Sequence, residues 1–207
     1  MIKPVIDIKI LGKADAPFGS EAYVENVKIE GIDCSEEVID DLSLERVFLD
    51  SVTLNQAKIG DLKVVDSIFS NCSLAGVDIE QAYFSRLECR GVRLQGIGLS
   101  QARMIDTTFL SSKMNDANLR YAKLKNVLFD SYDFSGVDCI GAELTHVVFR
   151  NCNLTGANFS QSKLTNVSLG GSEITDIVID TDAIKEVFVD TGQAIYLSSL
   201  FGLKIQD

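Results

Sequence analysis

The sequence is poor in the residues from which catalytic and metal sites are usually built. Its 207 residues include one histidine, two prolines and no tryptophan. No apolar run approaches the roughly 18 residues needed to cross a membrane, and Asp7 and Lys9 interrupt the opening stretch, which is therefore not a signal peptide. With 46% hydrophobic residues the chain is not disordered. We expect a folded protein that makes no contact with a membrane.

Basic residues are also scarce, because 19 lysines and arginines stand against 30 acidic residues, giving a net charge of −11. This balance argues against direct nucleic-acid binding and favours basic or DNA-binding partners. The acidic excess lies in residues 1–50 and 171–207, while the segment between them is close to neutral. The five cysteines, an odd number in a chain without an export signal, indicate free thiols in a reducing compartment. We therefore expect a cytoplasmic protein.

What the sequence does contain is a five-residue period. Every fifth residue from Ile29 to Ile179 is apolar, with no insertion. Neither a helix nor a simple strand gives that spacing. A second, smaller apolar series lies two residues before these centres, and glycine or asparagine is frequent two residues after them. Each unit is thus a short strand followed by a corner, and such units must stack as a solenoid to bury their apolar side.

Recurrences at twenty residues set the number of sides. Stacked side chains tend to match in size, so a twenty-residue recurrence predicts four five-residue sides in each coil. About eight coils of about 4.8 Å make a rod of roughly 37 Å. Both prolines precede the repeats, as expected where backbone N–H groups are needed for a ladder. The recurrent residues are Ala82, Ala102, Ala122, Ala142, Phe109, Phe129 and Phe149.

The units DANLR, YAKLK, GAELT and GANFS, at residues 116–120, 121–125, 141–145 and 156–160, match the pattern A(D/N)LxX. The sequence thereby resembles the pentapeptide-repeat family from residue 24 to about 180. The resemblance implies an all-β fold, a right-handed quadrilateral parallel β-helix. Two residues depart from the pattern, because Glu37 and Tyr132 occupy inward positions where a small apolar residue is expected. We expect Glu37 to turn outward in a loose first coil and Tyr132 to widen its coil.

The sequence predicts three regions. Residues 1–23 form an N-terminal strand and cap, in which residues 5–11 are a strand covering the first coil and residues 12–20 a turn. Residues 24–180 form the β-helix. Residues 181–207 hold a strand near Val187–Val189 and a short α-helix from an N-capping Thr191 to about Phe201, stopped by Gly202.

The C-terminal helix is apolar around most of its circumference. Such a helix is buried on two sides, one against the last coil and the other against a partner, most simply a second copy of the chain. The alternative is a simple cap that leaves a few apolar residues exposed. The residues expected in a homodimer interface are Ile195, Tyr196, Leu197, Leu200 and Phe201.

The ending DTGQAIYLSSLFGLKIQD is also similar to the tail of pentapeptide-repeat proteins that bind DNA gyrase and confer quinolone resistance. Those proteins are dimers, acidic rods that mimic DNA. The projecting loops of some members are absent here, because the register has no insertion. The resemblance implies DNA gyrase or topoisomerase IV as partner.

No motif in the sequence supports catalysis. It lacks a nucleophile elbow, a phosphate loop and a dinucleotide-binding turn. His146 falls at a corner, and a solvated corner histidine explains it better than a catalytic base. The cysteines fall at inward positions and none is twenty residues from another, so buried structural thiols are expected. We therefore predict that the protein is not an enzyme and that it has neither a metal nor a cofactor.

The outward rows are the remaining places for function. A basic row could meet an anionic partner, an apolar outer row could be a contact surface, and an acidic cluster could imitate phosphates; for each, an ordinary solvated surface is the alternative. The basic row is Lys63, Arg103, Lys123 and Lys163. The outer apolar row is Phe48, Ile68, Leu128 and Val148, with Glu88 and Thr108 between them. The acidic cluster is Glu36, Glu37, Asp40, Asp41, Glu45 and Asp50.

Two non-enzymatic functions remain. One is a DNA-mimicking binder of a type II topoisomerase that modulates the action of its inhibitors, supported by the charge, the rod and the tail. The neutral middle of the chain counts against it. The other is a protein–protein interaction scaffold that docks a partner on the apolar or the basic row.

Overall fold

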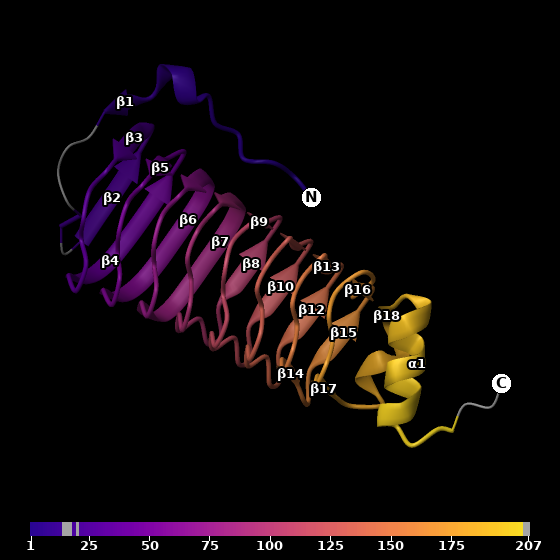
Figure 1. Ribbon diagram of the computed structural model, residues 1–207. Helices are drawn as coiled ribbons and strands as arrows, with labels where there is room; N and C mark the ends of the chain where they lie inside the picture. The colour runs from indigo at the N-terminus through magenta and orange to yellow at the C-terminus, as the bar shows by residue number, and fades with distance from the viewer. Residues whose placement is uncertain (14–17, 20, 205–207) are drawn as a thin grey trace.

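The computed structural model describes residues 1–13, 18–19 and 21–204, and shows a rod of stacked coils closed by a helix at its C-terminal end (Figure 1). Parallel partners in the rod are twenty residues apart, as in Leu124 with Leu144 and Phe129 with Phe149. Each coil therefore has four five-residue sides, and the four-sided β-helix is confirmed. Each side contributes one inward-facing residue per coil, and these residues stack into a column at intervals of twenty in the sequence. We number the sides by the first and last residues of their columns: side 1, Ile29 to Leu169; side 2, Cys34 to Ile174; side 3, Ile39 to Ile179; side 4, Leu44 to Leu164.

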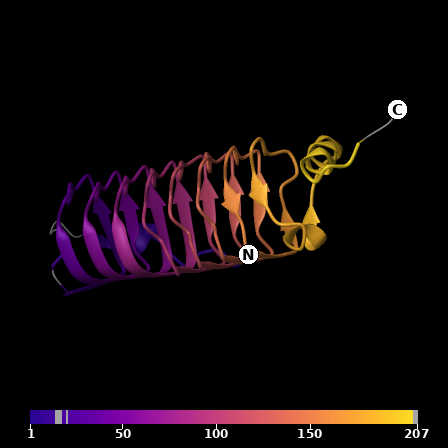
Figure 2. The same ribbon diagram turned by 90° about the horizontal axis from the view of Figure 1, so that it is seen from below.

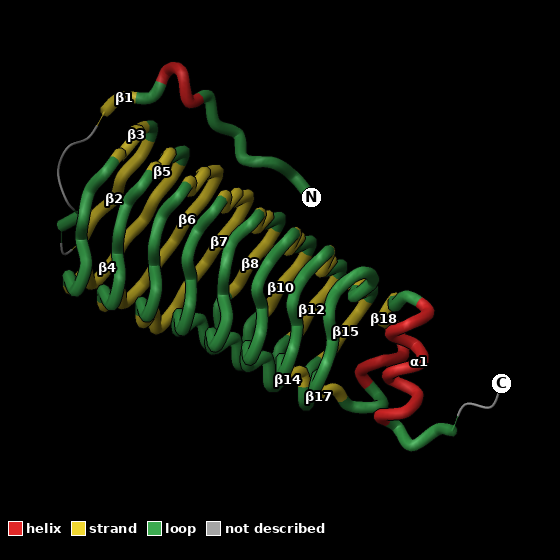
Figure 3. Tube along the Cα trace, in the orientation of Figure 1, coloured by secondary structure: helices red, strands yellow, loops and turns green. Residues whose placement is uncertain are grey.

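Sides 1 and 4 hold most of the strands (Figures 1 and 3). On side 1 lie β3 (Val27–Glu30), β5 (Phe48–Asp50), β9 (Thr108–Leu110), β11 (Leu128–Asp130), β13 (Val148–Arg150), β16 (Val167–Ser168) and β18 (Val187–Phe188). On side 4 lie β2 (Glu21–Glu25), β8 (Arg103–Ile105), β10 (Lys123–Lys125), β12 (Glu143–Thr145) and β15 (Lys163–Thr165).

Sides 2 and 3 are held largely by isolated parallel bridges, such as Asp33 with Thr53. Side 3 also carries β14 (Asn158–Phe159) and β17 (Val178–Ile179). In the early coils one strand spans several sides: β4 (Val38–Glu45) covers sides 3 and 4, while β6 (Lys58–Ser70) and β7 (Asp78–Arg90) continue onto side 1.

The inward columns make one continuous apolar core. Phe109, Phe129 and Phe149 stack on one another, with ring centroids 5.0 and 5.1 Å apart. Tyr132 points inward and is 2% exposed, with its ring edge against Phe129 and its hydroxyl oxygen without a hydrogen-bond partner. Glu37 is exposed, as expected of a residue that turns outward. Corner residues adopt positive φ, as at Gly96 and Gly136 (both 64°), which explains the preference for glycine and asparagine there.

The prediction that residues 5–11 form a strand over the first coil is wrong. A 3₁₀-helix, Ile8–Ile10, lies in this segment, and the short strand is β1 (Gly12–Lys13), which pairs with β3 in the first coil. Gly12 and Lys13 thus contradict the turn predicted over residues 12–20; positions 14–17 and 20 lie outside the described residues. Residues 1–11, which we call the strap, run along the side of the rod (Figure 2).

The strap lies along the rod because its backbone finds acceptors there. The N–H groups of Val5 and Ile2 donate to the carboxylates of Asp66 and Asp106, at 3.0 and 3.1 Å. Pro4, between them, has no N–H to contribute to a ladder over the first coil. The contacts span 61 and 104 residues of sequence, so the five-residue period gives no hint of them.

At the other end, α1 (Thr191–Leu200) follows β18. Its N-cap is Asp190 and not Thr191, because the Asp190 carboxylate accepts the backbone N–H of Gln193 while the Gln193 side chain accepts the N–H of Asp190. Gly202, with φ of 81°, follows the C-cap as expected. None of the helices described is long and apolar enough to cross a membrane.

Candidate interaction surfaces

The described residues offer no set of side chains for catalysis. They contain no group of three histidine, cysteine or acidic residues that could hold a metal ion. His146 is exposed at a corner, with its Nε2 atom 3.4 Å from the Asn166 side-chain nitrogen. All five cysteines are free and buried, and burial raises the pKa of Cys72 and of Cys152 to about 11. These thiols stay protonated near neutral pH, so they are poor nucleophiles.

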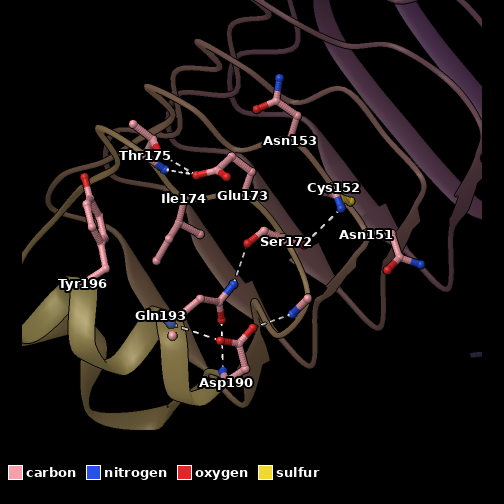
Figure 4. Close-up of a pocket in the computed structure, with 12 residues that line it drawn as sticks. Asn151, Cys152, Asn153, Ser172, Glu173, Ile174, Thr175, Asp190, Gln193 and Tyr196 are labelled. Atoms are coloured by element: carbon pink, nitrogen blue, oxygen red, sulfur yellow. Dashed lines mark hydrogen bonds between the residues drawn. The ribbon is translucent and has the colours of Figure 1, made fainter.

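A groove of about 700 Å³ lies between the last coil and α1 (Figure 4). Its polar groups are largely used within the protein: Gln193 Nε2 donates to the carbonyl oxygens of Leu169 and Ser172, both at 2.7 Å, and Asp190 accepts the Gly171 N–H at 3.0 Å. The backbone N–H groups of Gln193 and Gly171, which donate to this carboxylate, lower the pKa of Asp190. Gln193 is 5% exposed and so holds the helix onto the rod. The residues that line the groove thus serve to fasten α1 as a cap on the end of the rod.

The helix divides its apolar residues between two directions. Leu197 is 3% exposed and packs against the core, joined by the partly buried Tyr196 and Phe201. Ile195 and Leu200 are 51% and 47% exposed on the outer surface. Of the five residues expected in a dimer interface, these two are the ones left open to a partner.

The predicted acidic cluster does not form one surface. The corner and strand positions distribute it around the first coil and the start of the second: Glu36 follows side 2, Asp40 and Asp41 follow the side 3 column, Glu45 lies on side 4 and Asp50 on side 1. Glu45 pairs with Arg46, which neutralises it. Sequence spacing places residues along the chain, but in a four-sided coil neighbours in sequence face different directions.

A larger acidic surface covers sides 2 and 3 and the corners that end them. Its acids are almost all exposed and are most numerous in the first and last coils, and Asp41 and Asp61 are direct neighbours in register. Among the described residues, one ion pair lies on these sides, Arg120 with Asp138 at 2.7 Å. We call this surface the acidic flank: Asp33, Glu36, Glu37, Asp40, Asp41, Asp61, Asp78, Asp116, Asp133, Asp138, Glu173, Asp176 and Asp180. Four cations interrupt it: Lys58, Arg93, Lys113 and Arg120.

Sides 1 and 4 are closer to neutral, because their acids are matched by cations. Asp130 pairs with Arg150 on side 1 at 2.8 Å, and Asp66 with Arg86 on side 4 at 2.6 Å. Arg86 also lowers the pKa of Asp66. Pairs of this kind cross neighbouring coils, twenty residues apart. They leave the net negative charge on the other two sides.

The predicted basic row does gather on side 4. Lys63, Tyr83 and Arg103 are register neighbours, and Lys123 follows Arg103 on the next coil. Lys123 pairs with Glu143 at 3.0 Å, with both side chains about half exposed. A groove of about 590 Å³ runs beside the row. The row ends with Lys163, in register with Glu143.

The outer apolar row is also real, but part of it is covered. Phe48, Ile68, Leu128 and Val148 share side 1, in register with Glu88 and Thr108 between them. Ile68 is 7% exposed, although it points outward from its strand, whereas Val148 is 36% exposed. The strap lies over the early part of the row and ends at Thr108, where the Met1 sulfur is 3.5 Å from the threonine hydroxyl.

Sequence analysis missed the two residues that hold the strap. Asp66 and Asp106 are corner residues with positive φ, each less than 10% exposed, and both accept strap N–H groups. The available signal was the recurrence of aspartate at the same corner forty residues apart. Corner aspartates are common in such repeats, so the signal did not distinguish a binding role from turn formation.

Comparison with known proteins agrees with this architecture. Residues 90–159 match the pentapeptide repeat region family, and the resemblance drawn from the sequence is confirmed. The same register continues on both sides of that range. The matched part of the chain is thus a pentapeptide-repeat β-helix. No curated protein matches the chain.

Solved structures that match the chain include a trypsin-treated variant of QnrB1, a plasmid-mediated fluoroquinolone resistance protein. It is 20% identical, with a TM-score of 0.39, and the match covers 88% of this chain and 89% of that one. Another is HetL, a pentapeptide repeat protein involved in heterocyst differentiation regulation in the cyanobacterium Nostoc sp. strain PCC 7120. It is 16% identical, with a TM-score of 0.37, and the match covers 80% of this chain and 86% of that one.

Proposed function

We propose that this protein is a non-enzymatic binding module whose acidic flank binds a DNA-binding protein in place of DNA. The observation that carries the proposal is the excess of exposed, mostly unpaired carboxylates over cations on two adjacent sides of the rod, thirteen against four, densest in the first and last coils. Neighbouring carboxylates such as Asp41 and Asp61 are one coil apart, about 4.8 Å. DNA likewise presents closely spaced negative charges along a stiff axis.

Because of the acidic flank, the neutral charge balance of the middle segment is a weaker objection to DNA mimicry. Residues 51–170 are balanced in sequence, but their cations lie mostly on sides 1 and 4, while acids such as Asp78, Asp116 and Asp133 lie on the flank. Among the described residues of the middle coils the flank has five acids against its four cations, so a partner that meets sides 2 and 3 encounters most of the negative charge in the first and last coils. Local surface charge, and not the total along the chain, steers such a partner.

The specific partner we propose is a type II topoisomerase, DNA gyrase or topoisomerase IV, because the C-terminal tail is similar to that of gyrase-binding pentapeptide-repeat proteins. Bound in place of DNA, the rod would change the action of inhibitors that trap the enzyme on DNA. We expect the purified chain to reduce gyrase supercoiling or to protect gyrase from a quinolone at micromolar concentration.

The decisive variant reverses charge on the flank, Asp41→Lys with Asp61→Lys. Its matched control is Glu30→Lys with Glu143→Lys, which changes the net charge by the same amount and with the same sign on sides 1 and 4. The flank variant is expected to lose its effect on supercoiling and the control to keep it. If neither the unmodified chain nor the control affects the enzyme at micromolar concentration, the topoisomerase proposal is wrong.

We further propose that two chains associate through their C-terminal helices. The outer surface of α1 presents Ile195 and Leu200, and Leu203 beyond it is 65% exposed. Burial of these residues between two copies would remove apolar surface from water. Sedimentation should show a dimer that becomes a monomer in the variant Ile195→Asp with Leu200→Asp. A monomer at all concentrations in the unmodified chain would overturn this.

The second candidate function is a protein–protein interaction scaffold, favoured by the outer apolar row. Its test is a partner that is bound through Phe48 and Leu128. The variant Phe48→Asp with Leu128→Asp would release such a partner, whereas it should leave topoisomerase binding through the acidic flank unchanged.

A further inference from the structure

The strap shows how side 1 of the rod holds an extended chain. Its backbone N–H groups at Val5 and Ile2 donate to carboxylates at the corner between sides 4 and 1, and both aspartate residues are less than 10% exposed. Pro4, Ile6 and Ile8 are half-buried, while the intervening Val5 and Asp7 are exposed. From Lys3 to Asp7, before the 3₁₀-helix Ile8–Ile10, the strap therefore faces the rod with every second side chain, as an extended strand would.

The spacing of these bonds follows from the rod itself. Asp66 and Asp106 are two coils apart, about 9.6 Å. Three residues of extended chain, from Ile2 to Val5, span about 10 Å. An extended segment running along the rod is thus in register with every second corner. The match comes from the coil height, so the spacing continues along the rod, whereas the carboxylate acceptors end at Asp106.

The surface under the strap continues beyond it. From Thr108, where Met1 ends, the same row proceeds in register through Leu128, Val148 and Ser168 to Phe188. Val148 and Phe188 are 36% and 61% exposed, against 7% for Ile68. We call the part from Leu128 to Phe188 the open row.

The charges around the open row define what it can hold. The adjoining outward residues Asp130 and Arg150 neutralise each other, with a 2.8 Å ion pair. The neighbouring corner carries Asn126, His146 and Asn166, none of them acidic or strongly basic. A neutral, apolar strip gives no attraction to a nucleic acid, whose binding depends on cations. It suits an uncharged, apolar segment.

We propose that the open row docks an extended, apolar segment of a partner protein, lying end to end with the strap. The partner segment presents apolar side chains at alternate positions to Leu128, Val148 and Phe188. A single extended chain suits the row because one outward residue per coil makes a narrow strip. The surface is distinct from the acidic flank, and the proposal rests on the second candidate function, the interaction scaffold, for which it names the part of the apolar row that binds and the kind of segment bound.

The test uses the full chain and a fluorescent peptide with the sequence of residues 1–11, which has the required alternation. Fluorescence anisotropy should show saturable binding. The variant Leu128→Asp with Val148→Asp should weaken binding at least about tenfold, equivalent to about 1.4 kcal/mol. The matched control, Thr145→Asp with Thr165→Asp, adds the same charge on side 4 and should bind like the unmodified chain.

A photo-crosslinking residue at position 6 of the peptide shows where it lies, independently of any variant. Crosslinks to residues 128–188 of side 1 support the proposal. Crosslinks to Phe48 or Ile68 would mean that the peptide replaces the strap, and would overturn it. Absence of binding up to about 1 mM, or equal binding by both aspartate variants, would overturn it as well.

Discussion

The early and late coils follow the same five-residue period but differ in backbone and in core. The early strands β4, β6 and β7 run straight across the corner between sides 3 and 4, whereas the later coils turn there with a left-handed residue, such as Gln101 with φ of 61°. Gln81, one coil earlier at the same corner, lies inside β7. The same residue type thus adopts two local structures, and its neighbours decide which.

The cores differ too. Aliphatic residues such as Ile39 and Val64 fill much of the early coils, whereas rings are concentrated between Phe109 and Phe159. Because inward positions have the same spacing in both, a coil accepts either filling. The comparison teaches that the period specifies the four-sided rod, while the kind of corner and the kind of core vary along it.

The largest effect is expected in the ring column. Phe129→Ala should lower the free energy of unfolding by about 3–5 kcal/mol, because it leaves a cavity and removes two stacked neighbours. The early-coil counterpart is Phe69→Ala, which removes a 4%-exposed ring with no described ring partner. Its loss should be smaller by about 1 kcal/mol. Urea unfolding measures both; equal losses would show that ring contacts add nothing.

A smaller effect is expected where early coils approach closely. A Cβ atom at Gly60 would lie 2.4 Å from the Asp40 carbonyl oxygen, so Gly60→Ala should destabilise by about 1–3 kcal/mol. At Gly98 the nearest atom is a carboxylate oxygen of Asp78, at 2.8 Å, which can rotate away. Gly98→Ala should therefore cost less. The reverse order in thermal unfolding would contradict the close approach in the early coils.

Acid should weaken the early coils through Asp66. Arg86 and the Val5 N–H lower the pKa of this carboxyl, so its contribution to stability is present above the pKa of the unfolded chain, about 3.9, and is lost as the pH falls through the folded value. Urea unfolding at pH 6 and pH 2.5 should show a smaller acid-induced loss in Asp66→Asn than in the unmodified chain. An unchanged loss would place the acid sensitivity elsewhere.

The smallest effect is expected at Tyr132, in the late coils. Its buried hydroxyl oxygen has no hydrogen-bond partner, so Tyr132→Phe removes a desolvated polar group and keeps the ring contacts. We expect a gain of about 1 kcal/mol. Tyr83→Phe is the control at an outward position and should change stability by less than about 0.5 kcal/mol. A destabilised Tyr132→Phe would show that the hydroxyl is satisfied in solution.

The sequence predicted much of the fold and the outward rows, because both follow from one period. Lys63 and Arg103, or Phe48 and Leu128, differ by multiples of twenty and so must share a side. The strap could not be predicted, because residues 1–11 carry no repeat and their partners are distant carboxylates. The direction of the C-terminal helix was equally hidden, since a helix apolar on most sides does not reveal that Leu197 faces the core.

By itself the sequence determined the inward columns, the coil of twenty residues and the sides on which charged and apolar residues lie, because an uninterrupted period leaves one way to bury every fifth residue. The tertiary structure decided which carboxylates remain unpaired and which part of the apolar row is covered. These depend on side chains of neighbouring coils and on a terminal segment meeting residues far away in the chain, and no local pattern records those encounters.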